Sequence, residues 1–278
     1  MPLAERFRRA GALTLWHLVL ASTSAAMAFP VAWALVTSFK GPQDVFTPTP
    51  LPWPATLDNY AAVLRFWPVG LLIGNTFVMS VGVAVGQLVI AVLAAYALVV
   101  LNPRMRPAIL TACTIALAVP PQAVIIPQFL LTTRLGWQNS QLGLIVPQLG
   151  ASALAVLLLV EHVAAVPASQ IEAAALQGAR PIETLWHVVL PTIRPAVLAV
   201  GILVFITTWN EYLWPLLIAP RSHDATVQIG LAQFQGEGGT DFGSLMAAST
   251  LTSLPIVAVY LIASRRIIDA FIRAGLRP

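Results

Sequence analysis

The sequence predicts an all-α integral membrane protein with six transmembrane helices, and three observations support this fold class. First, 58% of the 278 residues are hydrophobic and only 9% are charged, whereas charged residues make up about a quarter of a soluble domain. Second, the apolar residues are gathered into runs long enough to cross a bilayer, which takes about 20 residues. Third, the arginines are distributed unevenly between the segments that join these runs.

Six apolar runs are expected to form the spans. The basic start of the chain resembles a secretory signal peptide, but the apolar run that follows is too long for one and is taken as the first span. Prolines predict a kink in the first span at Pro30 and bends or unwound turns in the third and fourth spans. The expected spans are Ala12–Thr37, Val69–Leu101, Ala108–Leu131, Leu142–Val160, Ala196–Ala219 and Phe242–Ser264.

Positive residues predict the orientation, because they are retained on the cytoplasmic side of a membrane. With the N-terminus inside, eleven arginines lie on the inner side and four basic residues on the outer side. Both termini and the polar stretch Ser169–Pro195 are therefore expected in the cytoplasm. The inner residues are Arg6, Arg8, Arg9, Arg104, Arg106, Arg180, Arg194, Arg265, Arg266, Arg273 and Arg277, and the outer ones are Lys40, Arg65, Arg134 and Arg221.

Catalytic chemistry has no support in the sequence. The only lysine, Lys40, lies outside any glycine-rich loop, so the chain has no P-loop and is not expected to hydrolyse nucleotide itself. The four histidines are scattered and the single cysteine, Cys113, lies in an apolar run, which predicts neither a metal site nor a disulfide. The net charge of +4 is assigned to membrane topology and not to nucleic-acid binding. We therefore expect a non-catalytic chain that binds no cofactor of its own.

A polar and aromatic cluster in the fifth span is the candidate for a solute pathway. An acidic residue within a span is costly and usually faces a bundle interior or a water-filled cavity. Amide and carboxylate groups beside aromatic rings suit a hydroxylated ligand such as a sugar. The alternative is that Glu211 lies near the outer interface and only caps or packs helices. The candidate residues are Trp209, Asn210, Glu211, Tyr212 and Trp214.

The stretch Ser169–Pro195 is predicted to form two short helices. The first covers Gln170–Leu176 and ends at Gly178, whose missing side chain permits a sharp turn. The second begins at Arg180-Pro181, since proline fits the first turn of a helix, and is expected to stop at Pro191. A polar pair of helices between two apolar spans is typical of a docking surface.

This stretch resembles the EAA loop of ABC importer permeases. The resemblance rests on Glu172-Ala173-Ala174, on Gly178-Ala179 six residues after the glutamate, and on Leu190-Pro191. Gln177 stands where the family usually has aspartate. The segment WNEYLWPLL, residues 209–217, is similar to the fifth span of carbohydrate permeases of the maltose and glycerol-3-phosphate type. The resemblance covers the chain from about Val69 to the C-terminus.

The resemblance implies a permease of a prokaryotic cytoplasmic membrane that takes up a sugar-like solute. Two ATP-binding cassette subunits, with their own ATP and Mg, would receive a coupling loop made of Glu172, Ala173, Ala174, Gly178, Ala179 and Pro191. A second homologous permease would complete the pathway. An extracytoplasmic binding protein would deliver the solute to the outer loops Lys40–Pro68 and Pro220–Asp241. The alternative is that the first loop only packs on the helices at the membrane interface and the second is a plain connector.

Three regions are expected along the chain: the first span with its proline-rich loop (1–68), the importer core (69–265) and a cytoplasmic tail (266–278). The competing hypothesis is a self-contained secondary transporter that uses Glu211 for ion coupling. Internal inverted repeats would favour that hypothesis, and none is evident. The sequence does not name the solute.

Overall fold

The computed structural model describes residues 3–47, 49, 51–221, 223–236 and 239–275, and the side chains within 16–262 except 48, 50, 222 and 235–240. The chain divides into two compact units. One comprises the chain up to Pro68 together with Gln233–Leu251, and the other comprises Val69–Ala232 and the chain from Thr252 onward. Helices account for nearly all regular structure in the described residues, which agrees with the predicted fold class.

The first unit contains α1 (Leu3–Thr37), α2 (Asp58–Phe66), a short antiparallel pair β1 (Gln235–Gly236) and β2 (Gly239–Thr240), and the start of α13 (Phe242–Gly275). The buried amide of Asn59 donates hydrogen bonds to the carbonyls of Ser38 and Lys40, at 3.0 and 2.8 Å. Lys40 is fully buried, donates to the Thr47 carbonyl and lies over the Trp33 ring. These contacts fold the loop after α1 onto α2.

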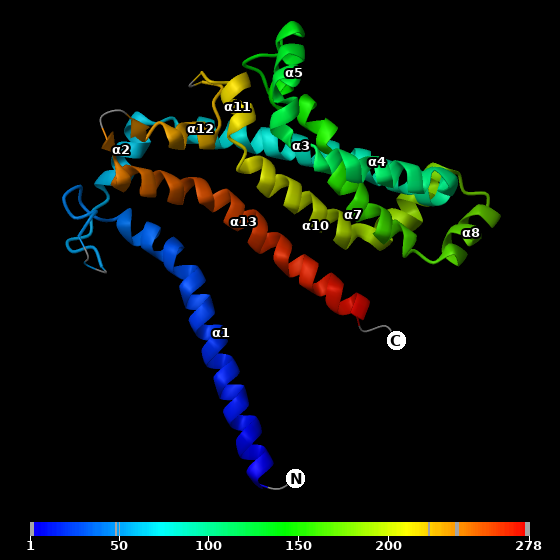
Figure 1. Ribbon diagram of the computed structural model, residues 1–278, viewed down its shortest axis with the longest axis horizontal. Coiled ribbons are helices and arrows are strands. Elements are labelled where there is room, and N and C mark those ends of the chain that lie inside the picture. The colour runs from blue at the N-terminus through cyan, green and yellow to red at the C-terminus, as the bar shows by residue number, and fades with distance from the viewer. Residues whose placement is uncertain (1–2, 48, 50, 222, 237–238, 276–278) are drawn as a thin grey trace. The chain divides into compact units, whose positions relative to one another are not determined.

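The second unit is built around α3 (Val69–Tyr96), which packs against α7 (Ala153–Ala164) and α10 (Leu190–Trp209), as Figure 1 shows. Two glycines spaced four apart on α3 permit close approach of the segment before α7. A Cβ atom added at Gly82 would lie 2.7 Å from Ile145, and one at Gly86 would lie 2.5 Å from Leu149. A larger residue at either position would therefore have to displace the end of the facing Ile145 or Leu149 side chain.

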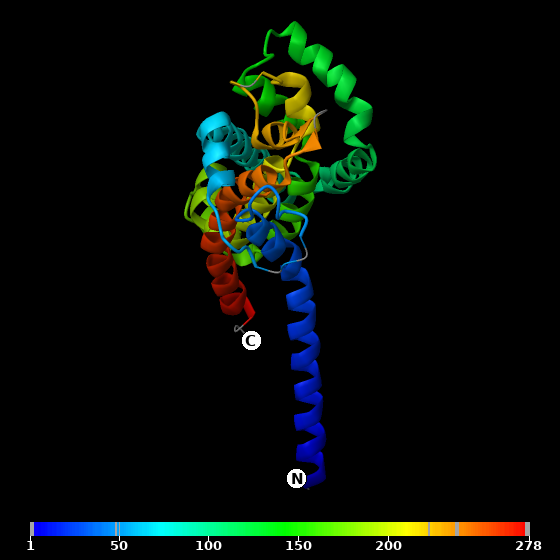
Figure 2. The same ribbon diagram turned by 90° about the vertical axis from the view of Figure 1, so that its left-hand side faces the viewer.

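Two of the predicted spans are broken, as their prolines indicated. α4 (Arg106–Ala118) and α5 (Pro121–Arg134) meet at an angle of 93°, with Pro120 in extended backbone at the junction (Figure 2). The other broken span consists of two segments that meet at 53°. The first is α6 (Gln141–Ile145) with the 3-10 helix η3 (Val146–Ala151), and the second is α7. Four helices in the described residues are long and apolar enough to cross a membrane, and there are up to six spans if each bent pair counts as one.

The remaining elements of the second unit connect these helices. They are η1 (Ala97–Leu101), η2 (Pro103–Met105), α8 (Ala168–Leu176), α9 (Pro181–Thr184), η4 (Leu185–Val189), α11 (Leu213–Ile218) and α12 (Val227–Ala232). A buried cluster of Met79, Leu144, Trp214, Ile218 and Ala219 joins α3, α6 and α11. It fixes α11 beside the broken fourth span.

The fifth span differs from its prediction at both ends. It begins without a break at Pro181 and continues through α9, η4 and α10 to Trp209, a run of 29 residues. The helix ends at Trp209 and not at Ala219, because residues 210–212 leave the helical path before α11 begins. The expected stop at Pro191 is wrong, because a π-helical turn, Leu185–Val189, precedes that proline. The wider turn makes room for a ring that would clash with the carbonyl four residues earlier.

Candidate functional site

The helix α8 is an exposed element that ends in a sharp turn. None of its nine residues is buried, although Ile171 and Ala174 are half-buried toward η4. Gly178 has a φ of +79°, and its N–H donates to the Ala175 carbonyl while that of Ala179 donates to Ala174. This is a Schellman motif, which uses a left-handed residue to satisfy the last carbonyls of a helix. The predicted role of Gly178 in ending this helix is confirmed.

The chain leaves this turn directly into the long fifth helix. Arg180 is extended, Pro181 opens α9, and the Glu183 carboxylate accepts a hydrogen bond of 2.7 Å from the Arg180 backbone N–H. An acidic residue in the first turn of a helix satisfies a free N–H and opposes the helix dipole. At ~1.5 Å per residue, the 29-residue helix from Pro181 to Trp209 is about 44 Å long. The turn at Gly178 is therefore attached to one end of a continuous helix.

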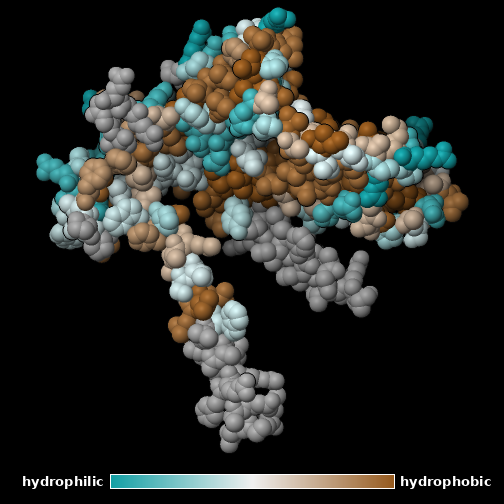
Figure 3. Space-filling view, viewed as in Figure 1, coloured by the Kyte–Doolittle hydropathy of each residue, from teal (hydrophilic) through white to brown (hydrophobic). Residues whose placement is uncertain are grey.

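The surface around this turn carries both apolar and charged side chains. Leu176, Ile182 and Trp186 are 90%, 51% and 59% exposed. Glu172 is exposed and forms no ion pair with any described residue. In Figure 3 hydrophilic surface gathers toward the α8 end of this unit, while hydrophobic surface dominates the helices beside it. Large apolar residues within a polar surface are typical of a protein–protein contact.

An open groove separates α8 from the start of α10. Its volume is about 550 Å³. Of the residues predicted for the coupling loop, Ala173, Ala174 and Pro191 line this groove. Glu172 and Gly178 are exposed and Ala179 is half-buried, and none of these three lines it. Gln177, which stands in place of the family's usual aspartate, is also part of the lining and presents an uncharged amide.

One side-chain contact attaches this region to α3, and an ion pair joins the helices α4 and α7 that precede it. The buried side chain of Thr184, whose hydroxyl donates to the Arg180 carbonyl, interacts with Tyr96 at the end of α3. Arg106 at the start of α4 and Glu161 in the last turn of α7 form an ion pair of 2.9 Å. The first contact is buried and the second is largely exposed, so Thr184 contributes more to holding the loop against the helices.

The break after α10 brings together the five residues predicted for the pathway, but in two environments. Trp209 is 1% exposed and packs against Phe205, with ring centroids 5.5 Å apart. Trp214 is 5% exposed and its indole N–H donates to the Gly143 carbonyl. These two rings lie in the packed interior. Asn210 and Tyr212 are exposed, and Glu211 is half-buried.

Glu211 both caps a helix and faces a hollow. One of its carboxylate oxygens accepts a hydrogen bond of 3.4 Å from the Trp214 backbone N–H in the first turn of α11. Glu211 also lines a hollow of about 210 Å³ between α3, α7 and α10. Its other polar lining residues are Gln87, Gln148, Thr207 and Thr208. The capping contact that the sequence offered as one alternative is present, and the pathway role of Glu211 stays a prediction.

Gln87 and Gln148 line the hollow, although neither was predicted as a site residue. The Gln87 amide donates to the Gln148 backbone carbonyl at 2.8 Å. The two glutamines are 61 residues apart in sequence, but they are adjacent in space and both line the hollow. A polar residue within a predicted apolar span was the available indication for both glutamines, since Gln87 lies in Val69–Leu101 and Gln148 in Leu142–Val160.

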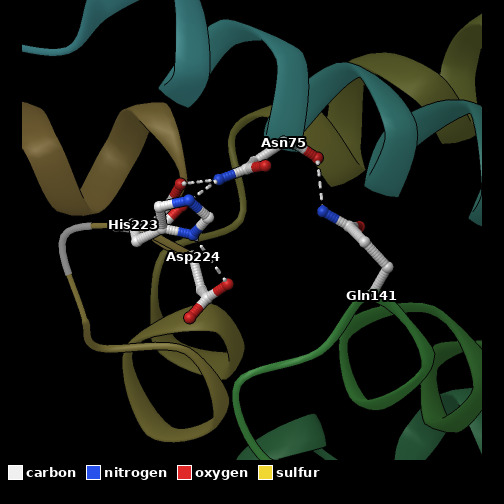
Figure 4. Close-up of polar contacts among 5 residues, drawn as sticks. Asn75, Gln141, His223 and Asp224 are labelled. Atoms are coloured by element: carbon white, nitrogen blue, oxygen red, sulfur yellow. Dashed lines mark hydrogen bonds and ion pairs between the residues drawn. The ribbon is translucent and has the colours of Figure 1, made fainter.

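The loop after α11 is held against the start of α3. The Asn75 amide donates to the carbonyls of His223 and Ala225, at 2.9 and 3.1 Å, and the Gln141 amide donates to the Asn75 carbonyl (Figure 4). Thr76 accepts a hydrogen bond from the Val227 N–H, at the start of α12. At the other end of this loop structure, Gln228 donates to the Asn210 side chain at 3.3 Å. The loop is thus linked to the break after α10.

A helical membrane protein with an exposed turn at one end of a long span, and a polar hollow beside a break at the other, has the construction of a transport permease. The comparisons identify which one. Residues 87–273 match the family described as the binding-protein-dependent transport system inner membrane component, and the chain belongs to this family. Family membership supports the ABC importer permease expected from the EAA-type residues over a self-contained secondary transporter.

Individual relatives agree with this assignment. The chain is 31% identical over 259 residues to the sn-glycerol-3-phosphate transport system permease protein UgpE of Pectobacterium atrosepticum, covering 90% of this chain and 92% of that one. It is 32% identical to the protein of that name from Salmonella typhi, covering 95% and 96%.

Solved structures show the same fold. A chain of a bacterial ABC transporter involved in import of the acidic polysaccharide alginate superposes with a TM-score of 0.81 at 21% identity, covering 95% of this chain and 99% of that one. The inward-facing MetNI methionine ABC transporter gives a TM-score of 0.57 at 16% identity, covering 76% and 97%.

Proposed function

We propose that this chain is one of two permease subunits of an ABC importer for a sugar or sugar-like solute. ABC importer permeases work with ATPase subunits and substrate-binding proteins. In this proposal two ATPase subunits, which bind ATP and Mg, contact the α8–α9 turn, and a second homologous permease encloses the pathway with this one. The names of its glycerol-3-phosphate permease relatives support the solute class.

The arginine distribution supports the orientation: both termini and the α8–α9 turn face the cytoplasm of a prokaryotic cell. The loops Lys40–Pro68 and Pro220–Asp241 then face outward, where a binding protein delivers solute. Residues 266–278 form the proposed cytoplasmic tail.

The observation that carries the proposal is the continuity of the α8–α9 turn with the fifth span. ATPase closure would move α8, with Glu172 paired to a basic residue of the ATPase and the small side chains of Ala173, Ala174 and Ala179 allowing close contact. Because the helix from Pro181 to Trp209 is continuous, that movement reaches the break where Glu211 lies. The result is a rigid-body change between inward- and outward-facing packings. Asn210, Glu211 and Tyr212 would line the pathway there, with the rings of Trp209 and Trp214 supporting them from behind.

Charge substitutions at two glutamates test this proposal. In the complex reconstituted in vesicles, Glu172→Gln should lower solute uptake per ATP hydrolysed, and Glu172→Lys should abolish it while the protein still inserts. Glu161→Gln is the matched control, since Glu161 is an exposed carboxylate already paired with Arg106. Gly178→Asp should also uncouple hydrolysis from uptake, because it adds a negative charge to the surface proposed to contact the ATPase. Wild-type coupling in both Glu172→Lys and Gly178→Asp would contradict the assignment of this loop.

A further inference from the structure

The polar lining of the hollow between α3, α7 and α10 consists of two amides, two hydroxyls and one carboxylate. Gln87 and Gln148 each use an amide N–H on a backbone carbonyl, of Gln148 and Leu144 respectively. The Thr207 hydroxyl donates to carbonyls within its own helix. Glu211 contributes a carboxylate, which can only accept hydrogen bonds. Each glutamine amide keeps a second N–H and Thr208 keeps its hydroxyl, so a ligand meets neutral donors and acceptors and the single carboxylate of Glu211.

The charge of the hollow is negative. Glu211 is its only charged lining residue, and no described lysine, arginine or histidine forms an ion pair with it. Gln87 is 7% exposed, and its side-chain amide lines the hollow beside the Gln148 carbonyl to which it donates. The remaining wall is apolar, formed by side chains such as Leu154, Leu158 and Leu203.

We infer that this hollow is a solute-binding subsite for neutral, hydroxyl-bearing molecules and that it excludes phosphorylated ones. Hydroxyl groups donate to the carboxylate and to the amide and threonine oxygens, while the C–H faces of a polyol or sugar meet the leucine wall. A phosphate brings about two negative charges at neutral pH, and the Glu211 carboxylate repels it while no lining residue supplies a positive charge. The volume of about 210 Å³ is below the ~300–1,000 Å³ of drug-sized sites, which fits a small polyol or one sugar unit.

This inference rests on the proposed permease role and narrows its solute. Two of the relatives are named as sn-glycerol-3-phosphate permeases, and their solute would carry the phosphate that this hollow disfavours. The charge of Glu211 therefore predicts that this chain and those relatives share a fold but take different solutes.

Modification of an introduced cysteine tests the inference without knowledge of the natural solute. Thr207→Cys is placed in a Cys113→Ser background of the assembled complex, and Ala151→Cys, also in the lining and exposed, replaces it if that variant does not assemble. A cationic methanethiosulfonate reagent should react several-fold faster than an anionic one of similar size. Glu211→Gln should remove that preference. A cysteine at Leu130, exposed on α5 and outside the hollow, is the control and should show no dependence on Glu211.

Protection by solutes completes the test. Sorbitol should slow modification of the cysteine, whereas glycerol 3-phosphate at the same concentration should not. Glu211→Gln should raise the sorbitol concentration needed for protection about tenfold, as expected for loss of one hydrogen bond to a charged group. Protection by glycerol 3-phosphate equal to that by sorbitol, absence of protection by both, or faster reaction of the anionic reagent would each overturn the inference. None of these results bears on ATPase coupling through Glu172, which is measured separately.

Discussion

Substitutions at Gly178 should change coupling according to how well each residue adopts a left-handed backbone. A Cβ atom added there meets nothing within 4 Å, so steric crowding contributes nothing to the effect. The φ of +79° is the constraint, and it costs an L-residue with a side chain about 1–2 kcal/mol. That energy corresponds to a ~5–30-fold loss in the population of the native turn. Asparagine tolerates this conformation better than alanine, and β-branched valine tolerates it least.

The assay is the ratio of solute uptake to ATP hydrolysed in proteoliposomes containing the whole complex. We expect the order glycine, asparagine, alanine, valine, from highest to lowest coupling, with the amount of assembled complex unchanged. Gly150→Ala is the control, since Gly150 also has open space around its Cβ position but no positive φ. Coupling that follows side-chain size, with alanine above asparagine, would refute the conformational explanation. So would a loss of coupling in Gly150→Ala equal to that in Gly178→Ala.

Two further predictions concern the stability of the second unit. Gly143→Ala would place a Cβ atom 2.1 Å from the Trp137 carbonyl oxygen, and we expect a loss of ~1–3 kcal/mol, measured as earlier thermal unfolding in detergent, whereas Gly150→Ala should unfold as wild type does. Glu161→Gln removes the ion pair with Arg106; the Glu161 side chain is 71% exposed and that of Arg106 is 30% exposed. The free energy of unfolding should therefore change by less than ~1 kcal/mol, and the change should vanish at high salt. A large, salt-independent effect of Glu161→Gln would show that this pair is more than a surface contact.

Local features of the sequence predicted those parts of the structure that are decided locally. Gly178 and Pro181 predicted the turn between α8 and α9. Glycine readily adopts the positive φ that ends α8, and the fixed φ of proline suits the first turn of α9. Pro120-Pro121 likewise marks the 93° bend between α4 and α5. Apolar length predicted the second span, which is helical from Val69 to Leu101.

The features that the sequence did not predict depend on tertiary context. The helix continues through Pro191 after a π-helical turn, Leu185–Val189, and that turn leaves no clear trace in composition. The break at residues 210–212 falls on Asn210, Glu211 and Tyr212, and this polar cluster was interpreted as a pathway site within a continuing span and not as the end of the helix. The hollow requires Gln87 and Gln148 to meet across 61 residues, which no local pattern encodes.

Cross-linking from α8 is the most direct test of the central claim that this turn contacts an ATPase. In the assembled complex with Cys113→Ser, a short thiol cross-linker should join Leu176→Cys, at a side chain that is 90% exposed, to the ATPase subunit. Leu130→Cys, on the exposed surface of α5, should give no such product. Cross-linking of Leu176→Cys that changes when ATP is added would show that the contact takes part in the cycle. Absence of the Leu176 product, or equal products from both positions, would contradict the account.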